Sequence, residues 1–493
     1  MIRQILQWMD NLSVPALRRA IVLCLFIFIW GLLTHEKYWG DGDEPHYMMI
    51  AHSLVFDRDL DVSNNYADKL NLVYDGNLED RHVQSGRGGK LYPAHDIGLP
   101  LLASPWFWVS YTVSQTLSEK LPRGLLAKMR LNRWGLLKLF LAFGMIGVTG
   151  FLSIQVFDIS LYITGNKTGC FLGTLLFIIS PPILSHAYLF YTEILTAGIA
   201  VYVYKKFKIE PFLSYVPACF LGFLTGYLLL IHIRNVWISA ALCGFAIWRW
   251  LDKPKEFKWL IAFFGGFLIA VAVRTGLNFY LWESLVSTPH ALFQHYEKLL
   301  TLKQVVLRFF ALTFDQEGGL LIYAPIYLFA LAGMGTLWKH SRRVLMEIAI
   351  MFIGNYAMIV SFPIWNGHGW HGFWSPASRY LVPAIPFLVI ASNIFFSKLK
   401  NLSVPAKFLI GMQCFLNLFF WQFPKLLWND GDGRSSFLLF LNPSGALSNI
   451  FPSWNAFNFH ALGISCVFFF IAWLWIASLS QDVFPTLVAG KKT

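Results

Sequence analysis

Long apolar runs recur between residues 20 and 480, and most polar residues fall between them. A run of about 20 apolar residues crosses a bilayer as a helix, because a helix pairs its backbone N–H and C=O groups internally. The pattern therefore predicts an all-α membrane protein with about 12 transmembrane helices. The predicted spans cover residues 20–34, 134–156, 168–183, 192–205, 212–231, 236–249, 259–281, 320–338, 345–362, 380–397, 408–422 and 457–479.

One apolar segment, residues 97–117, decides which loops face which side. It is long enough to span, but it carries Pro100, Pro105 and several hydroxyl side chains. If it spanned, four short basic loops would face outward, against the preference of lysine and arginine for the cytoplasmic side. We therefore predict a juxtamembrane helix in the membrane interface, which leaves these loops and both termini inside. The basic loops are 205–208, 249–258, 339–343 and 398–407.

This topology divides the chain into segments with different expected roles. They are the N-terminal tail and first span (1–34), a long external catalytic loop with juxtamembrane helices (35–133), a transmembrane core (134–281), a second external loop (282–319) and a C-terminal transmembrane bundle with external loops (320–493). The same topology puts residues 185–193, 363–379 and 423–454 on the outer side.

Composition supports the membrane assignment and removes some classes of function. Of the 493 residues, 56% are hydrophobic and only 13% are charged, and the mean hydropathy is +0.54. Lipid must therefore be the solvent for much of this surface. The net charge of +12 fits basic cytoplasmic loops, so we expect no nucleic-acid partner. The six cysteines lie in apolar runs without metal-ligand or disulfide spacing.

The sharpest polar motif follows the first span, where Asp41, Asp43 and Glu44 stand within four residues. Residues 35–96 contain twelve acidic and six basic side chains in an otherwise basic protein. Crowded carboxylates raise one another's pKa and suit general-base catalysis, and Asp41 with Asp43 could recruit a divalent metal. The alternative is a helix N-cap, since an Asp before Glu-Pro is typical of a helix start.

Other polar side chains fall on the same predicted face. His95 and Asp96 lie directly before the interfacial segment, and Glu193 stands at the mouth of a span. We predict these residues as contacts for the acceptor or the sugar, together with Tyr92. A turn with a helix cap is an equally good explanation for His95 and Asp96, as a helix cap is for Glu193.

Cations on this face are predicted to bind a phosphate. They are Arg81, Lys90, Arg234 and Arg379. Arginine binds phosphate with two parallel hydrogen bonds, and both Arg234 and Arg379 stand at span ends. The alternative is that their aliphatic stems lie along apolar surface while the charge reaches water.

A late aromatic loop, WNGHGWHGFW at 365–374, completes the predicted outer face. His368, Trp370 and His371 are candidates for carbohydrate contact. Two histidines in a glycine-rich loop are a weak signal for metal binding. The tryptophans also fit an aromatic belt at the membrane interface.

The order of these spans and polar motifs resembles that of a known family. A first span, an Asp-Glu pair in a long external loop with juxtamembrane helices, and many later spans resemble the GT-C superfamily of integral-membrane glycosyltransferases. Within it, the chain is most similar to the branch of protein O-mannosyltransferases and lipid A aminoarabinose transferases. The family's Asp-Glu pair matches Asp43-Glu44, and its acid at the start of a later span matches Thr192-Glu193.

Two further segments match less completely. Tyr92-Pro93 resembles a family loop in which a basic residue and two prolines precede the second juxtamembrane helix, but Ala94 replaces the second proline and the lysine is displaced to Lys90. The segment RYLVPAIPFL that begins at Arg379 also resembles a family segment.

The resemblance implies a function and a location. The donor would be a sugar linked to a polyprenyl phosphate, and Asp43 would be the base in an inverting transfer. The expected acceptor is a hydroxyl of a cell-envelope glycan, lipopolysaccharide or other acceptor, with a protein hydroxyl as a further option. The site would face the periplasm of a bacterial-type inner membrane. No cofactor is required, although a divalent metal is compatible with the acids.

Two other classes of function are the alternatives. A transporter or flippase for lipid-linked sugars would place ionisable groups at mid-membrane depth. Here the predicted spans are nearly uncharged, and the exceptions, Lys138 and Arg274, lie near span ends. A polymerase or ligase for such sugars would rely on a large, late, arginine-bearing external loop. In this chain the largest external loop comes first and is acidic.

Overall fold

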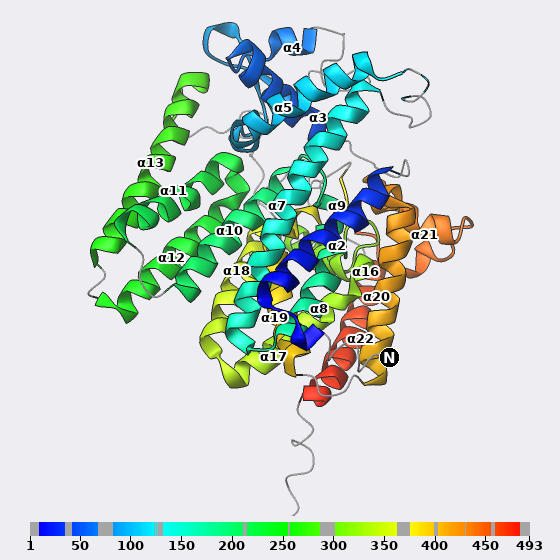
Figure 1. Ribbon diagram of the computed structural model, residues 1–493. Coiled ribbons are helices and arrows are strands. Elements are labelled where there is room, and N and C mark those ends of the chain that lie inside the picture. Colours follow the sequence, from blue (N-terminus) through cyan, green and yellow to red (C-terminus); the bar gives the residue numbers. More distant parts are fainter. Residues whose placement is uncertain are drawn as a thin grey trace, which may run out of the picture. The chain divides into compact units, whose positions relative to one another are not determined.

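A computed structural model describes most of the chain (Figure 1). The described residues are 9–34, 42–67, 82–122, 124, 126, 132–210, 214–254, 257–285, 301–361, 375–398, 403–428, 430–454 and 459–483. They form two compact units, each assembled from separate stretches of chain. Unit 1 comprises residues 1–39, 150–186 and 300–493, and unit 2 comprises residues 40–149 and 187–299.

Unit 2 contains most of the residues singled out in the sequence. Its helices are α3 (Glu44–His52), α4 (Ser63–Ala67), α5 (Gly98–Lys120), the first half of α7 (Arg133–Thr164), α10 (Thr192–Ile209), α11 (Tyr215–Ile231), α12 (Val236–Asp252) and α13 (Phe257–Trp282). A short antiparallel hairpin joins β1 (Val83–Ser85) to β2 (Leu91–Pro93). Its register pairs Val83 with Pro93 and Gln84 with Tyr92.

Unit 1 is helical. It contains α2 (Val14–Thr34), the second half of α7, α8 (Lys167–Ile178), α9 (Ile183–His186), α15 (Leu302–Phe314), α16 (Leu320–Tyr323), α17 (Leu328–His340), α18 (Arg342–Ser361), α19 (Ile385–Lys398), α20 (Val404–Gln422), α21 (Ser436–Leu441) and α22 (Phe459–Val483).

Each predicted span overlaps helix in the described residues, which confirms the all-α fold class. Among the described residues, five helices are long and apolar enough to cross a membrane, and three shorter helices are apolar. The five are Arg133–Thr164, Phe257–Trp282, Arg342–Ser361, Val404–Gln422 and Phe459–Leu479.

The span predicted at 320–338 is broken rather than continuous. Ala324 leaves the helical region (φ −144°, ψ 68°) between α16 and a 3-10 turn at residues 325–327. Pro325 explains the break, because proline lacks an N–H and crowds the residue before it. Helix then resumes as α17.

The segment at 97–117 forms helix α5, as predicted, and Gly98 begins it. A Cβ at Gly98 would lie 2.5 Å from the backbone nitrogen of Ile231, so only glycine lets α5 begin this close to the end of α11. Phe107 is fully buried, while Leu102 and Trp108 are more than half exposed. Apolar side chains of α5 therefore lie both against the protein and on its exposed surface.

In unit 1, two acids hold the late loop in place. The carboxylate of Glu317 accepts hydrogen bonds from the backbone N–H groups of Gly431 (3.0 Å) and Gly433 (2.7 Å). Asp315 accepts another from the backbone of Trp454 (2.8 Å). Buried carboxylates satisfied by backbone donors fix loop conformation, so this acidic motif is used to position the segment 430–454.

Glycines bring α11 and α13 into backbone contact. A Cβ at Gly266 would lie 1.8 Å from the carbonyl oxygen of Cys219, and one at Gly222 would lie 1.7 Å from that of Phe263. Gly222 and Gly226 form a Gly-x-x-x-Gly pair on α11. Helices in lipid associate through such small residues, because apolar burial gives little driving force there.

We expect Gly266→Ala to destabilise the protein by about 1–3 kcal/mol, because the added methyl group meets backbone that cannot move aside alone. The matched control is Gly265→Ala, where a Cβ meets nothing within 4 Å. Thermal unfolding in detergent should show a lower midpoint for the first variant only. Equal midpoints would contradict the close contact.

Candidate functional site

Asp43 stands at the N-cap position of α3, but its side chain does not cap the helix. Its Oδ1 lies 3.9 Å from Nε2 of His95, and its side chain is 23% exposed. The helix start is provided instead by Pro45 in the first turn. The capping role proposed as an alternative is therefore not how the Asp43 carboxylate is used.

The β1–β2 hairpin brings two histidines beside Asp43. His82 directly precedes β1, and its carbonyl oxygen accepts a hydrogen bond from the backbone N–H of Ala94 (2.8 Å), just past β2. This pairing places His95 next to His82, with His82 Nδ1 at 2.9 Å from His95 Nε2.

A third histidine, His46, supports this pair from α3. Its ring stacks on that of His82, with centroids 3.8 Å apart, and its Nδ1 lies 2.6 Å from the Tyr66 hydroxyl. Burial, followed by the proximity of His82, lowers the pKa of His46 to about 3. His46 is therefore uncharged at neutral pH and does not compete for the Asp43 charge.

Asp43, His82 and His95 each offer a metal-ligand atom, and these atoms lie within 4.8 Å of one another. Imidazole and carboxylate groups are common ligands of divalent transition metals. The described residues thus contain a set of donor atoms that could hold a metal, which agrees with the expectation that a divalent metal is possible. The partner expected for Asp43 in that role, Asp41, lies outside them.

Glu44, beside Asp43, is buried and held from two sides. Its Oε1 accepts a hydrogen bond from the backbone N–H of Phe190 (2.8 Å), and its Oε2 lies 3.8 Å from Nζ of Lys138. Only 2% of its side chain is exposed. The contacts tie the start of α3 to α7 and to the turn before α10, which is a positioning role.

Asp96 is buried between Arg274 and His232. Its Oδ1 lies 3.7 Å from Nη2 of Arg274, and its Oδ2 lies 3.8 Å from Nδ1 of His232. The backbone N–H of Ile233 also donates to Oδ2 at 3.2 Å. Burial raises the pKa of Asp96 to about 6, although Arg274 opposes the rise.

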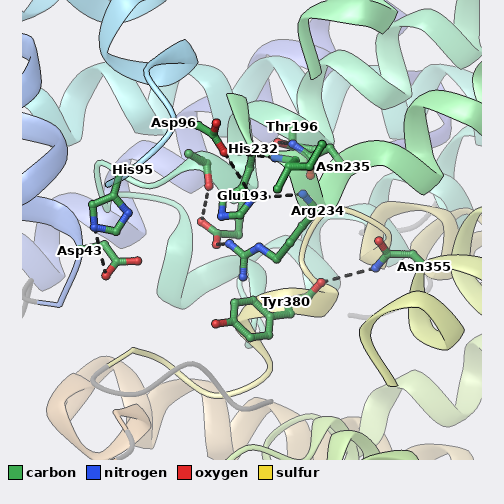
Figure 2. A network of polar contacts seen from close by, with 12 residues as sticks. Asp43, His95, Asp96, Glu193, Thr196, His232, Arg234, Asn235, Asn355 and Tyr380 are labelled. Atoms are coloured by element: carbon green, nitrogen blue, oxygen red, sulfur yellow. Dashed lines mark hydrogen bonds and ion pairs between the residues drawn. The ribbon is translucent and has the colours of Figure 1, made fainter. Parts of the chain in front are cut away.

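Glu193 opens α10 and pairs with Arg234. Oε1 of Glu193 lies 3.4 Å from Nη2 of Arg234, and the neighbouring Thr192 hydroxyl donates to Oε2 at 3.2 Å. Figure 2 shows this pair close to Asp96 and His232, while Asp43 and His95 form a separate pair. Among the described residues, unit 2 therefore holds two polar groups: the Asp43 group with His82 and His95, and a second network of Asp96, Glu193, His232, Arg234 and Arg274.

The remaining predicted residues lie elsewhere. Tyr92 is buried in β2, where its ring meets that of Trp282 edge-on. Lys90 is more than half exposed and lies 3.8 Å from Asp61. Arg379 is buried in unit 1, with its guanidinium over the ring of Tyr380. The other predicted residues, Arg81, His368, Trp370 and His371, lie outside the described residues.

Several residues of these groups were missed as functional candidates. Lys138 and Arg274 are cations within apolar helices, and the cost of placing them there was a signal that each has an acidic partner. His82 and His232 had no such signal, because a single histidine between other elements has no characteristic pattern.

No protein-family model matches the chain, and no curated protein matches it. The chain is similar, at 12% identity, to two crystal structures of the Archaeoglobus fulgidus oligosaccharyltransferase. For the complex with Zn and sulfate, the match covers 84% of this chain and 52% of that chain, with a TM-score of 0.39. For the form tethered with an acceptor peptide containing the NVT sequon, it covers 97% and 56%, with a TM-score of 0.42.

This chain therefore spans about half the length of the oligosaccharyltransferase chains that it matches.

Replacing Lys138 by Met should leave the Glu44 carboxylate buried without its cation. Both side chains are largely buried (13% and 2% exposed), so we expect a loss of about 3 kcal/mol in stability. Adding Glu44→Gln to this variant should recover part of the loss, because a neutral amide needs no counter-charge. Additive losses in this double-mutant cycle, measured by unfolding in detergent, would exclude the pairing.

Asp96 should make stability depend on pH. Its pKa is raised from 3.8 to about 6 in the folded protein. The folded state therefore binds more protons than the unfolded state between about pH 4 and pH 6, and stability falls as the pH rises through this window. Relative to Asp96→Asn, the wild-type melting temperature should decline across it. Parallel pH profiles for the two proteins would rule out this role.

Proposed function

We propose that the chain is an integral-membrane glycosyltransferase of the GT-C type, in which Asp43 is the general base. The single observation that carries the proposal is the difference between Asp43 and the other described acids that the sequence singled out in unit 2. The side chain of Asp43 is 23% exposed, whereas those of Glu44, Asp96 and Glu193 are 2%, 6% and 3% exposed. A general base must reach the acceptor's proton, and each buried acid instead faces a cation.

The reaction that fits is transfer of a sugar from a polyprenyl-phosphate donor to a hydroxyl. Asp43 takes the proton of the acceptor hydroxyl as its oxygen attacks the anomeric carbon. The bond from that carbon to the phosphate oxygen breaks, polyprenyl phosphate leaves with the electron pair, and configuration inverts. An arginine near the membrane boundary would stabilise the leaving phosphate, and Arg234 is our first candidate in unit 2.

The environment of the chain favours this donor. A lipid-linked sugar lies in the membrane, and the chain has apolar helices of spanning length. The distribution of basic loops favours a site on the periplasmic face of a bacterial-type inner membrane, within the external loop 35–133. We propose a cell-envelope glycan or lipopolysaccharide as the acceptor class.

Asp43→Asn should lower transfer by about 10²–10⁴-fold, because the amide cannot accept the proton. The matched control is Asp59→Asn, an exposed acid of the same loop whose carboxylate accepts a hydrogen bond from Ser53 that an amide can also accept. The assay follows labelled sugar from a panel of polyprenyl-phosphate donors into envelope-lipid extract, using purified protein.

Unchanged turnover in Asp43→Asn would remove the proposed base. If the wild type transferred sugar from none of the donors but moved lipid-linked sugar across reconstituted vesicles, the protein would be a transporter instead.

A further inference from the structure

We infer that the late segment 435–454 of unit 1, which begins with the short helix α21, lies in the membrane interface and contacts lipid through Phe440, Leu441 and Ile450. The partner is the bilayer itself, and the contact does not depend on the proposed glycosyl transfer. The inference rests on the charge pattern of the segment, the exposure of these three side chains and their continuity with a spanning helix.

The charge pattern divides the stretch between α20 and α22 into two parts. Residues 425–434 carry four charged side chains, whereas residues 435–454 carry none. Moving a charged side chain out of water is costly, so lipid can cover the second part far more readily than the first. The four charged residues are Lys425, Asp430, Asp432 and Arg434.

Three large apolar side chains of the uncharged part are exposed. Helix α21 buries Phe437 and Leu438 in the core of unit 1, while Phe440 and Leu441 at its end are 50% and 47% exposed. Ile450, further along the segment, is 59% exposed. Singly exposed apolar residues are ordinary, but several on one short segment indicate a contact with a membrane or a protein.

The exposed end of α21 continues the outer surface of α20, beside which it lies in Figure 1. Helix α20 is long and apolar enough to cross a membrane, and its Phe415 and Leu418 are exposed. The ring of Phe440 contacts those of Phe419 and Phe423, with centroids 5.8 Å and 5.0 Å apart. Lipid that covers α20 therefore reaches Phe440 without a break, and this continuity favours the bilayer over another protein as the partner.

Polar contacts hold the other side of the segment against the protein. The backbone N–H of Ser435 donates to Oε1 of Gln316 (3.3 Å), and the Ser435 hydroxyl lies 3.0 Å from that of Tyr323. Gln316 in turn donates from Nε2 to the carbonyl oxygen of Ser448 (3.3 Å) and from its backbone N–H to that of Pro452 (2.9 Å). These hydrogen bonds fix the orientation of the segment, so its exposed apolar side chains cannot turn inward.

The experiment attaches the environment-sensitive fluorophore NBD to a Phe440→Cys variant of the full chain, in which the six native cysteines are replaced by alanine. The protein is reconstituted at one copy per phosphatidylcholine nanodisc. Spin-labelled lipids then quench the fluorophore either at the headgroup end of the acyl chains or at the bilayer centre. We expect blue-shifted emission relative to water, and stronger quenching by the label at the headgroup end.

Two further labelled positions calibrate the result. Asp432→Cys is the matched control, because Asp432 is an exposed residue of the charged part of the same stretch. It should emit as in water and be quenched little by either lipid. Phe415→Cys, on the exposed surface near the middle of α20, should be quenched most by the label at the bilayer centre.

A signal from Phe440→Cys like that of Asp432→Cys would place the side chain in water and overturn the inference. Shielded emission that neither lipid quenches would also overturn it, because protein rather than lipid would then cover the site. If Phe440→Cys did not fold, Ile450→Cys from the same uncharged part takes its place, with the same expected and contradicting outcomes. These readouts are independent of sugar transfer, so a failure of the glycosyltransferase proposal leaves this inference standing.

Discussion

The cost of holding charge where water is scarce determines how unit 2 is built. A buried carboxylate loses several kcal/mol of hydration, so it persists only with a counter-charge or hydrogen-bond donors. Glu44 meets Lys138, Asp96 meets Arg274, and Glu193 meets Arg234. Each pair joins segments that are distant in sequence. The ion pairs therefore fix the relative positions of these segments more specifically than non-directional apolar packing would.

The same constraint separates the acids by role. An acid that is neutralised by a buried cation is committed to the fold, while the side chain of Asp43 stays 23% exposed and lies beside the imidazoles of His82 and His95. A sequence motif of clustered acids therefore contains both structural and chemical members. Position in the motif does not distinguish them, but the partner of each carboxylate does.

Helix positions were largely predictable from the sequence, because the length of an apolar run is a local property. The break at Ala324 is also local, since Pro325 is visible in the sequence. The pairings were not predictable from the sequence. A cation in an apolar helix, such as Lys138 or Arg274, indicates that an acidic partner exists but not which residue it is. His82 lies next to His95 only because of the register of the hairpin. The Asp43 neighbourhood thus became defined only when long-range contacts were known.

The turn that links the two strands of the hairpin has a consequence of its own. Gly88 and Gly89 adopt positive φ (69° and 70°), and a Cβ at either would meet nothing within 4 Å. The residues just before them are held by the end of α13, since Arg87 pairs with Glu283 at 3.0 Å and a Cβ at Gly86 would lie 2.4 Å from the carbonyl oxygen of Leu281. The hairpin that carries the two imidazoles is therefore anchored on its turn side as well as by its strand register, and the turn itself requires glycine for its backbone conformation rather than for lack of space.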